Sequence, residues 1–323
     1  MSKPSVLIGL VAIGRNEGER LKRCLRSVPS GVPVVYVDSA STDSSVEFAR
    51  STQATVVELD MAKPFSAARA RNEGFAALLR RYPDITFVQF VDGDCELEPH
   101  WLDRAMNFFE TQPQIAAVCG RRRERYPNAS LYNRMCDEEW NTPTGQAYAC
   151  GGDAMMRVKA FVDVGGYDAM MIAGEEPELC SRLRGAGWQI WRLDLPMTIH
   201  DADMHRFDQY WKRAIRSGFG YAQVFRKTAS GGGDRLYKRE VARALSWTLG
   251  VTFAALLCAV IFGGAGLILA PVIWITQWFR LGLRDGFAKG GRMLVSKIAE
   301  AIGIMRFLYG QMRGRNQGAI FYK

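Results

Sequence analysis

An apolar run at residues 87–91 ends in two aspartates separated by one glycine, Asp92-Gly93-Asp94. The run is short, aromatic and β-branched, and polar residues bound it, so it predicts a buried strand. Ligands of open α/β sheets bind at the carboxyl ends of the strands, where these two carboxylates would lie. Oxygen ligands suit Mg²⁺ or Mn²⁺, which usually keep substrate phosphates in their shell. The pattern favours a nucleotide-diphosphate site, and a solvated strand-end turn is the alternative.

Strand-like and helix-like segments alternate over residues 5–120. The expected strands are residues 6–13, 34–37, 55–59, 87–91 and 116–120, and the expected helices are residues 17–28, 44–51, 67–81 and 99–111. This rhythm predicts an α/β fold with a mostly parallel sheet and helices on both faces.

Residues 121–210 are less regular. They contain a glycine loop at 150–153, a glycine turn at 165–168 and an acidic helix at 175–179. A strand at 189–193 leads to His200-Asp201. We interpret this region as the acceptor-side half of the same domain.

Residues 245–279 carry no charge. A helix over 245–262 would be about 27 Å long at 1.5 Å per residue, roughly one hydrocarbon thickness. Four small residues at 263–266 interrupt it, so we expect a membrane hairpin, spanning or re-entrant, with the glycines at its tip. Both flanks are basic, which places them in the cytoplasm. The alternative is a buried helix pair in a soluble protein.

The net charge of +9 is concentrated around this apolar segment. We expect the basic tail to bind anionic lipid headgroups rather than to be a merely solvated surface. No nucleic-acid-binding signature is present in the sequence, so we expect no nucleic-acid partner. Seven cysteines without a Cys-x-x-Cys pair argue against a disulfide framework or a zinc site. The N-terminal apolar run is too short for a signal peptide, which favours a cytoplasmic body.

Several segments, in their order along the chain, resemble the motifs of family 2 glycosyltransferases of the GT-A fold. They are VAIGRNEG at 11–18, VDSASTD at 37–43, ARNEG at 70–74, DGD at 92–94, GGDAMMR at 151–157, GGYD at 165–168 and GEEPELCSRL at 174–183. The resemblance covers about residues 5–215. Each motif is weak by itself, but their order and spacing together are specific.

The resemblance implies a role for each matched segment. Asp38 would accept hydrogen bonds from the base, Asp92 would contact ribose or metal, and Asp94 would be the main metal ligand. The glycine loop would lie beneath the donor sugar. The expected nucleotide-sugar contacts are Ala12, Gly14, Asn16, Glu17, Asp38, Ser41, Arg71, Asp92, Gly93, Asp94, Gly152, Asp153 and Arg213.

The family's Glu-Asp pair becomes Glu175-Glu176 here, and Glu176 takes the place of the aspartate that acts as base. A general base removes the proton of the acceptor hydroxyl while a metal stabilises the leaving diphosphate. Such a base works best with a raised pKa, which burial could supply. The alternative for this acidic segment is a solvated helix N-terminus.

Two further features refine the expectation. His200 follows a strand where related GT-A enzymes place a third metal ligand, and a purely structural histidine is the alternative. The Gln-x-x-Arg-Trp motif of processive enzymes is absent from the sequence, which favours transfer of a single sugar. Arg213 is expected to contact diphosphate or a lipid acceptor.

The sequence therefore predicts a metal-dependent, inverting glycosyltransferase using Mn²⁺ or Mg²⁺, with a UDP-sugar donor and a lipid-linked saccharide or glycolipid acceptor. We place it at the bacterial inner membrane, facing the cytoplasm. A non-catalytic nucleotide-sugar-binding scaffold and a sugar-phosphate nucleotidyltransferase remain as alternatives. The expected parts are a nucleotide half at 1–120, an acceptor half at 121–243, a hairpin at 244–280 and a basic tail at 281–323.

Overall fold

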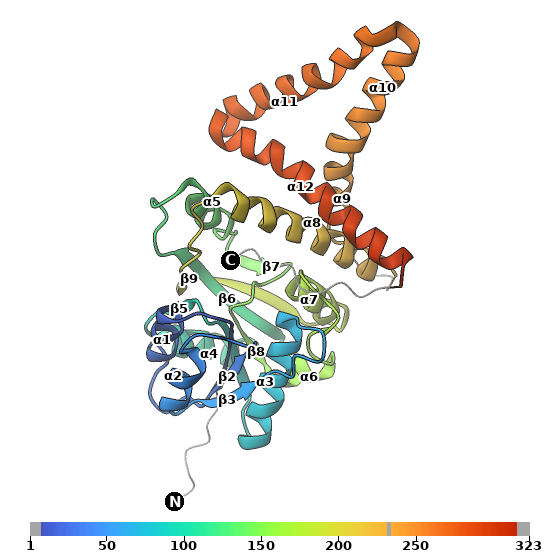
Figure 1. Ribbon diagram of the computed structural model, residues 1–323. Coiled ribbons are helices and arrows are strands. Elements are labelled where there is room, and N and C mark those ends of the chain that lie inside the picture. The colour runs from blue at the N-terminus through green and yellow to red at the C-terminus, as the bar shows by residue number, and fades with distance from the viewer. Residues whose placement is uncertain (1–7, 231–233, 315–323) are drawn as a thin grey trace, which may run out of the picture. The chain divides into compact units, whose positions relative to one another are not determined.

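The computed structural model describes residues 8–230 and 234–314 (Figure 1). The chain divides into two compact units, a sheet unit that ends at Arg206 and a helical unit that begins at Phe207. The first two residues of the strand expected at 6–13, and residues 315–323 of the expected basic tail, lie outside the described residues.

One sheet organises the first unit, with the strand order β3-β2-β1-β4-β8-β6-β9-β5 and β7 paired to β9. The strands are β1 (Ile8–Gly14), β2 (Val34–Asp38), β3 (Thr55–Glu58), β4 (Phe87–Asp92), β5 (Cys95–Leu97), β6 (Ile115–Glu124), β7 (Gly145–Ala147), β8 (Ala154–Arg157) and β9 (Gln189–His200). The strands from β3 to β4 are parallel, as predicted.

The second half of the sheet is mixed. β8 runs antiparallel to both β4 and β6, whereas β6 and β9 are parallel. The expectation of a mostly parallel sheet therefore describes only the first half. β9 is also longer than the predicted strand at 189–193, because the register shifts around Pro196 let a residue without an N–H sit within the ladder.

Helices flank this sheet. They are α1 (Glu19–Arg26), α2 (Ser45–Ser51), α3 (Ala67–Arg81), α4 (Trp101–Thr111), α5 (Leu131–Glu139), α6 (Val158–Asp163) and α7 (Glu175–Gly185). α3 has the predicted bounds, since the Ser66 hydroxyl caps its first turn by accepting from the Arg69 N–H at 3.1 Å. Helix α1 begins two residues later than expected, because Asn16 and Gly18 adopt left-handed backbone angles.

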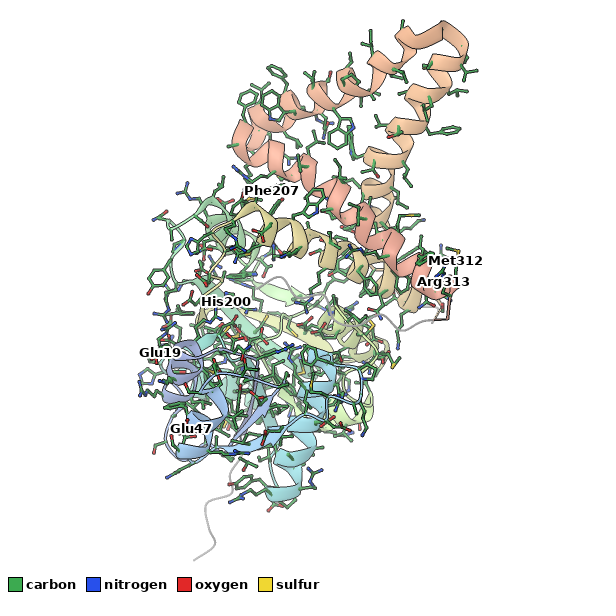
Figure 2. The ribbon with its side chains drawn as sticks, viewed as in Figure 1. Glu19, Glu47, His200, Phe207, Met312 and Arg313 are labelled. Carbon is green, nitrogen blue, oxygen red and sulfur yellow. The ribbon has the colours of Figure 1, made fainter. Side chains whose placement is uncertain are left out.

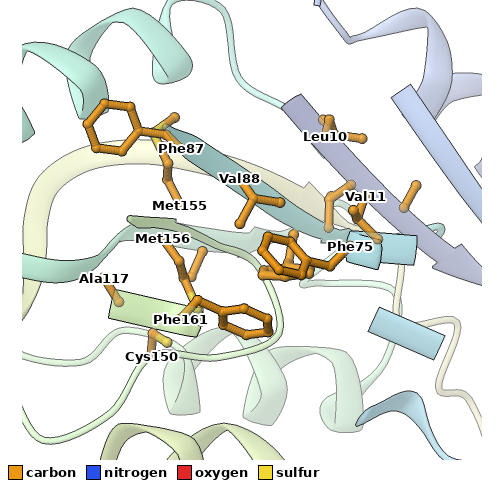
Figure 3. Packing of buried hydrophobic residues seen from close by; sticks show 14 of the residues in the cluster. Leu10, Val11, Phe75, Phe87, Val88, Ala117, Cys150, Met155, Met156 and Phe161 are labelled. Atoms are coloured by element: carbon orange, nitrogen blue, oxygen red, sulfur yellow. The ribbon is translucent and has the colours of Figure 1, made fainter. Parts of the chain in front are cut away.

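The core covers both faces of the sheet. Part of it lies between α3, α6 and the central strands, where Figure 3 shows Val11, Val88, Phe75 and Phe161. Gly74 permits close contact of α3 with β1 and β2, since a Cβ there would lie 2.7 Å from a Val37 methyl. The Phe161 and Tyr167 rings pack edge to face, 5.4 Å apart. The Tyr167 ring also packs on Phe90 of β4, and so it links the aromatic core to the carboxyl end of that strand.

The described residues of the second unit form helices and short connections, with no strand. It contains α8 (Phe207–Ser230), α9 (Lys238–Leu245), a π-helical turn η1 (Ser246–Gly250), α10 (Val251–Phe262), a 3₁₀ segment η2 (Gly263–Ile268), α11 (Leu269–Asp285) and α12 (Phe287–Met312). Gly218 and Gly303 lie where α8 and α12 touch, and a Cβ on either would overlap the other helix. α8 packs on α12, and the helical unit begins at Phe207. The functional boundaries expected at residues 120, 243 and 280 stay predictions.

The stretch Lys238–Asp285 is long and apolar enough to cross a membrane, and its most apolar window has a mean hydropathy of 2.5 with none of it buried. Its exposed residues include Phe253, Val260 and Phe262. Figure 1 shows α10 and α11 running in different directions from η2, where the sequence placed the glycine tip.

Candidate active site

The carboxyl ends of β1 and β2 hold the residues that were expected to face the nucleotide. Asp38 is buried, and its carboxylate accepts from the Tyr36 hydroxyl at 2.9 Å and from the Ser41 N–H at 2.8 Å. Ser41 in turn accepts from the Asn16 N–H at 2.8 Å. Asn16 Oδ1 accepts from the Thr42 N–H at 2.7 Å. These bonds join the loop that follows β1 to the loop that follows β2, and together the two loops form one rim of the site.

Gly14, Glu17 and Gly93 lie close together at the carboxyl ends of β1 and β4, since a Cβ on either glycine would lie within 3.3 Å of Glu17 Cγ. The Gly93 N–H donates to the Ile13 carbonyl at 2.7 Å, and a Cβ on Gly93 would lie 3.0 Å from that oxygen. Glu17 pairs with Arg20 at 3.0 Å. Ala12 is fully buried in β1, and its contact with the nucleotide stays a prediction.

Arg71 of α3 lies at the centre of the site, with a side chain only 2% exposed. Its Nη2 donates to Asp92 Oδ1 at 2.8 Å, and its Nη1 donates to Glu175 Oε1 at 2.9 Å. Glu176 Oε1 lies 3.5 Å from the same Nη1. The guanidinium carbon lies 5.5 Å from the centre of the Tyr167 ring. One buried cation thus joins the end of β4 to the start of α7.

These charges shift the two acidic groups in opposite directions. Burial, with the neighbouring Glu175 carboxylate, raises the pKa of Glu176 to about 7, although Arg71 works against the shift. Burial also acts to raise the pKa of Asp92, but Arg71 and Arg122 outweigh it and hold that pKa below its usual value. Asp92 therefore stays ionised at neutral pH, while Glu176 can bind or release a proton there.

The glycine loop lies against this cluster. A Cβ on Gly152 would overlap Arg71 Nη2 and lie 3.1 Å from Asp92 Oδ2. The buried Asp153 accepts from the Asp92 N–H at 3.0 Å and from the Thr198 hydroxyl at 2.8 Å. The absence of a side chain at Gly152 lets the Arg71–Asp92 ion pair form.

Asp94 and His200 lie close together beside this cluster. Asp94 is in the turn between β4 and β5, and His200 is the last residue of β9. Their Oδ2 and Nε2 atoms lie 3.3 Å apart, and both side chains are buried. The ligand atoms of Asp94, Cys95 and His200 all lie within 4.8 Å of one another. His200 Nδ1 is a buried atom that forms no hydrogen bond within the described residues. Figure 2 labels His200 on the sheet unit.

This donor set fits a divalent cation. A carboxylate oxygen suits Mg²⁺ or Mn²⁺, and the imidazole favours Mn²⁺ of the two. The Cys95 thiol is a soft ligand, and burial raises its pKa well above the usual value, so it is not expected to bind a hard cation.

Sequence reasoning missed two charged residues and one ring. Arg122 on β6 lies 3.3 Å from Asp92 Oδ2 and 3.5 Å from Asp153 Oδ2. Its guanidinium carbon lies 4.9 Å from the centre of the Trp140 ring, which also contacts His200 edge-on at 4.6 Å. Glu124, also on β6, has its Oε2 atom 3.5 Å from His200 Nδ1. The charged run at 121–125 gave a signal, since alternate residues of a strand share a face.

Arg213 belongs to α8 of the helical unit, whereas the other expected site residues belong to the sheet unit. Its contact with a diphosphate or an acceptor stays a prediction.

Comparison with known proteins identifies the family. A model of glycosyl transferase family 2 matches residues 11–165. The chain is 27% identical over 217 residues to a pre-mycofactocin glycosyltransferase from Mycobacterium tuberculosis, covering 63% of this chain and 44% of that protein. It is 34% identical over 73 residues to the succinoglycan biosynthesis protein ExoA of Rhizobium meliloti, covering 23% and 21%. The chain thus spans less than half the length of these relatives.

Solved structures agree on the fold. The mannosyltransferase PcManGT from Pyrobaculum calidifontis, in complex with GDP-Man and Mn²⁺, superposes with a TM-score of 0.63 at 21% identity, covering 94% of this chain and 91% of that one. TarS 1-349 from S. aureus superposes with a TM-score of 0.53 at 14% identity, covering 96% and 92%. The chain therefore carries a glycosyl transferase family 2 domain over residues 11–165, on a GT-A fold.

Proposed function

We propose that this protein transfers one sugar from a nucleotide-diphosphate sugar, which we expect to be a UDP-sugar, to an acceptor hydroxyl with inversion at the anomeric carbon. The observation that carries the proposal is the cluster of Arg71, Asp92 and Glu176. In this cluster Arg71 links the ionised Asp92 carboxylate at the end of β4 to the Glu176 carboxyl group, whose pKa is about 7.

Glu176 is the general base in this proposal. Its side chain is 17% exposed, so an acceptor hydroxyl can reach a carboxylate that is otherwise shielded from water. With a pKa of about 7, the group is ionised in part of the molecules at neutral pH and is basic enough to accept the hydroxyl proton. A single base and a direct displacement give inversion.

Asp94 and His200 are the residues that would hold a divalent cation, with Asp92 beside them. A bound Mn²⁺ or Mg²⁺ supplies Lewis-acid stabilisation of the negative charge on the leaving diphosphate. The chain itself holds the donor end of the site in place: Asp38, Ser41 and Asn16 form one hydrogen-bonded rim. Arg122 places a second positive charge beside Asp92.

The acceptor is proposed to be a lipid-linked saccharide or a glycolipid at the cytoplasmic face of the inner membrane. The apolar stretch Lys238–Asp285 and the basic residues on both of its flanks support this placement. They would hold the domain where such an acceptor presents its hydroxyl group.

The test measures release of nucleoside diphosphate from UDP-, GDP- and dTDP-sugars, with Mn²⁺ or EDTA and native membranes as the source of acceptor. Release that needs Mn²⁺ and is lost in Asp94→Ala and Glu176→Gln supports the proposal. Binding of a nucleotide sugar without turnover favours a scaffold. Release of pyrophosphate from a sugar phosphate and a nucleoside triphosphate would indicate a nucleotidyltransferase.

A further inference from the structure

A buried carboxylate, Glu124, lies on the opposite side of the His200 ring from Asp94. Glu124 Oε2 is 3.5 Å from His200 Nδ1, while Asp94 Oδ2 is 3.3 Å from His200 Nε2. The imidazole therefore lies between two carboxylates, one facing each ring nitrogen. Glu124 is the last residue of β6 and is 5% exposed.

Fixed donors hold the Glu124 carboxylate in place. Oε1 accepts from the Tyr126 N–H at 3.1 Å and from Asn133 Nδ2 at 3.2 Å. Oε2 accepts from the Ala202 N–H at 3.0 Å. A carboxylate with three such donors has little freedom to turn, so the position of the oxygen that faces His200 is fixed by the backbone.

The same contacts anchor the segment that follows His200. Asn133 Oδ1 accepts from the Met204 N–H at 3.0 Å, and the Ser130 hydroxyl donates to the Met204 carbonyl. Helix α5 is thus tied to residues 202–204 at several points, and Glu124 lies where these bonds meet the imidazole.

We propose that Glu124 is a positioning residue that holds the His200 ring with Nε2 directed toward Asp94, ready to share a divalent cation with it. The inference rests on the proposed function, which makes His200 a metal ligand. A histidine ligand usually donates its other ring N–H to a carboxylate, which fixes the tautomer and raises the basicity of the liganding nitrogen. Glu124 Oε2 is the carboxylate oxygen that faces Nδ1. Their 3.5 Å separation makes no hydrogen bond in this structure, so in the proposal the ring moves slightly toward Glu124 when Nε2 binds the cation.

The test compares Glu124→Gln with a matched control, Asp137→Asn. The amide keeps the shape of Glu124 but removes the charge that faces Nδ1. Asp137 is a nearby acidic residue on α5. It accepts from the Glu124 N–H at 2.8 Å and pairs with Arg121, and it does not contact His200. Binding of Mn²⁺, alone and with UDP, is followed by electron paramagnetic resonance, and thermal unfolding checks the fold.

We expect Glu124→Gln to weaken Mn²⁺ binding by about 10- to 100-fold, and Asp137→Asn to change it by less than about 2-fold. If Glu124→Gln does not fold, Asn133→Ala removes one donor to the carboxylate and should weaken binding in the same direction. Equal affinity in Glu124→Gln and wild type, with weak binding in His200→Ala, would overturn this inference alone. Unchanged binding in His200→Ala would instead remove His200 from the proposed metal site.

Discussion

Arg71 offers the sharpest test of the site, because one buried guanidinium compensates three carboxylates. The change is Arg71→Met, which keeps most of the side-chain volume and removes the charge. Asp92, Glu175 and Glu176 then lose their common partner, and Glu175, whose side chain is 4% exposed, cannot turn to water. Breaking a buried ion pair in this way costs about 3–5 kcal/mol.

Residues 8–206 form the unit that contains Arg71, and for a domain of this size the loss corresponds to a fall in melting temperature of about 6–20 °C. Arg69→Met is the matched control on the same helix. Arg69 pairs with Glu73, whose side chain is 39% exposed, and also donates to the Lys63 and Pro64 carbonyls. Because its loss leaves no second buried charge, it should cost only about 1–2 kcal/mol.

Thermal unfolding followed by circular dichroism compares the two variants with the wild type. The double variant Arg71→Met with Glu175→Gln should regain part of the lost stability, because one of the uncompensated charges is removed. If Arg71→Met melts within the range of Arg69→Met, the reasoning about a shared buried cation is refuted.

Three further predictions concern the base, the glycine loop and the apolar helices. The wild-type rate should rise as the pH passes through about 7, because the base must be ionised. Glu176→Gln should lower turnover by about 10²- to 10⁴-fold. A rate that stays constant from about 1.5 pH units below this pKa to about 1.5 units above it would contradict the role of Glu176. Gly152→Ala should destabilise by about 1–3 kcal/mol in urea unfolding, because its Cβ overlaps the buried guanidinium. Gly151→Ala, whose Cβ meets open space, should be silent. Val260→Asp should reduce flotation with anionic vesicles, whereas Val162→Asp, equally a surface change but in the sheet unit, should not.

The raised pKa of Glu176 also links pH to stability. Because the folded state favours the protonated carboxyl, this group's contribution is complete below its ordinary pKa of 4.5 and is lost as the pH rises through about 7. Fully ionising it in the folded state costs about 3 kcal/mol, from the difference between the two values. Ionisation of Glu176 around pH 7 therefore both makes it able to act as a base and makes its burial unfavourable.

Local signals explain where the sequence was a good guide. The bounds of α3 follow from a serine cap and an apolar face, and the parallel order of β1, β2 and β4 follows from strands that alternate with helices. The mixed half of the sheet was not predicted, because β8 and β9 pair with strands distant in sequence. Such pairings are decided by tertiary packing, and short segments carry little information about them.

The site divides in the same way. The sequence pointed to Asp92, Asp94 and Glu176 because each belongs to a short motif that resembles one of the family. Arg122 and Glu124 were missed: the charged run marks a shared strand face, but nothing within β6 says that this face meets His200. The division into compact units at Arg206 likewise depends on α8 packing against α12, a contact between segments distant in sequence.

The sequence by itself determined the family, the motif residues and the apolar stretch, because these depend on residue type and spacing along the chain. Only the tertiary structure decided how the charges are shared. It placed one arginine among three carboxylates, raised the pKa of Glu176 through burial and set the His200 ring between Asp94 and Glu124. Electrostatic interactions depend on distance and on exclusion of water, and both are properties of the folded chain.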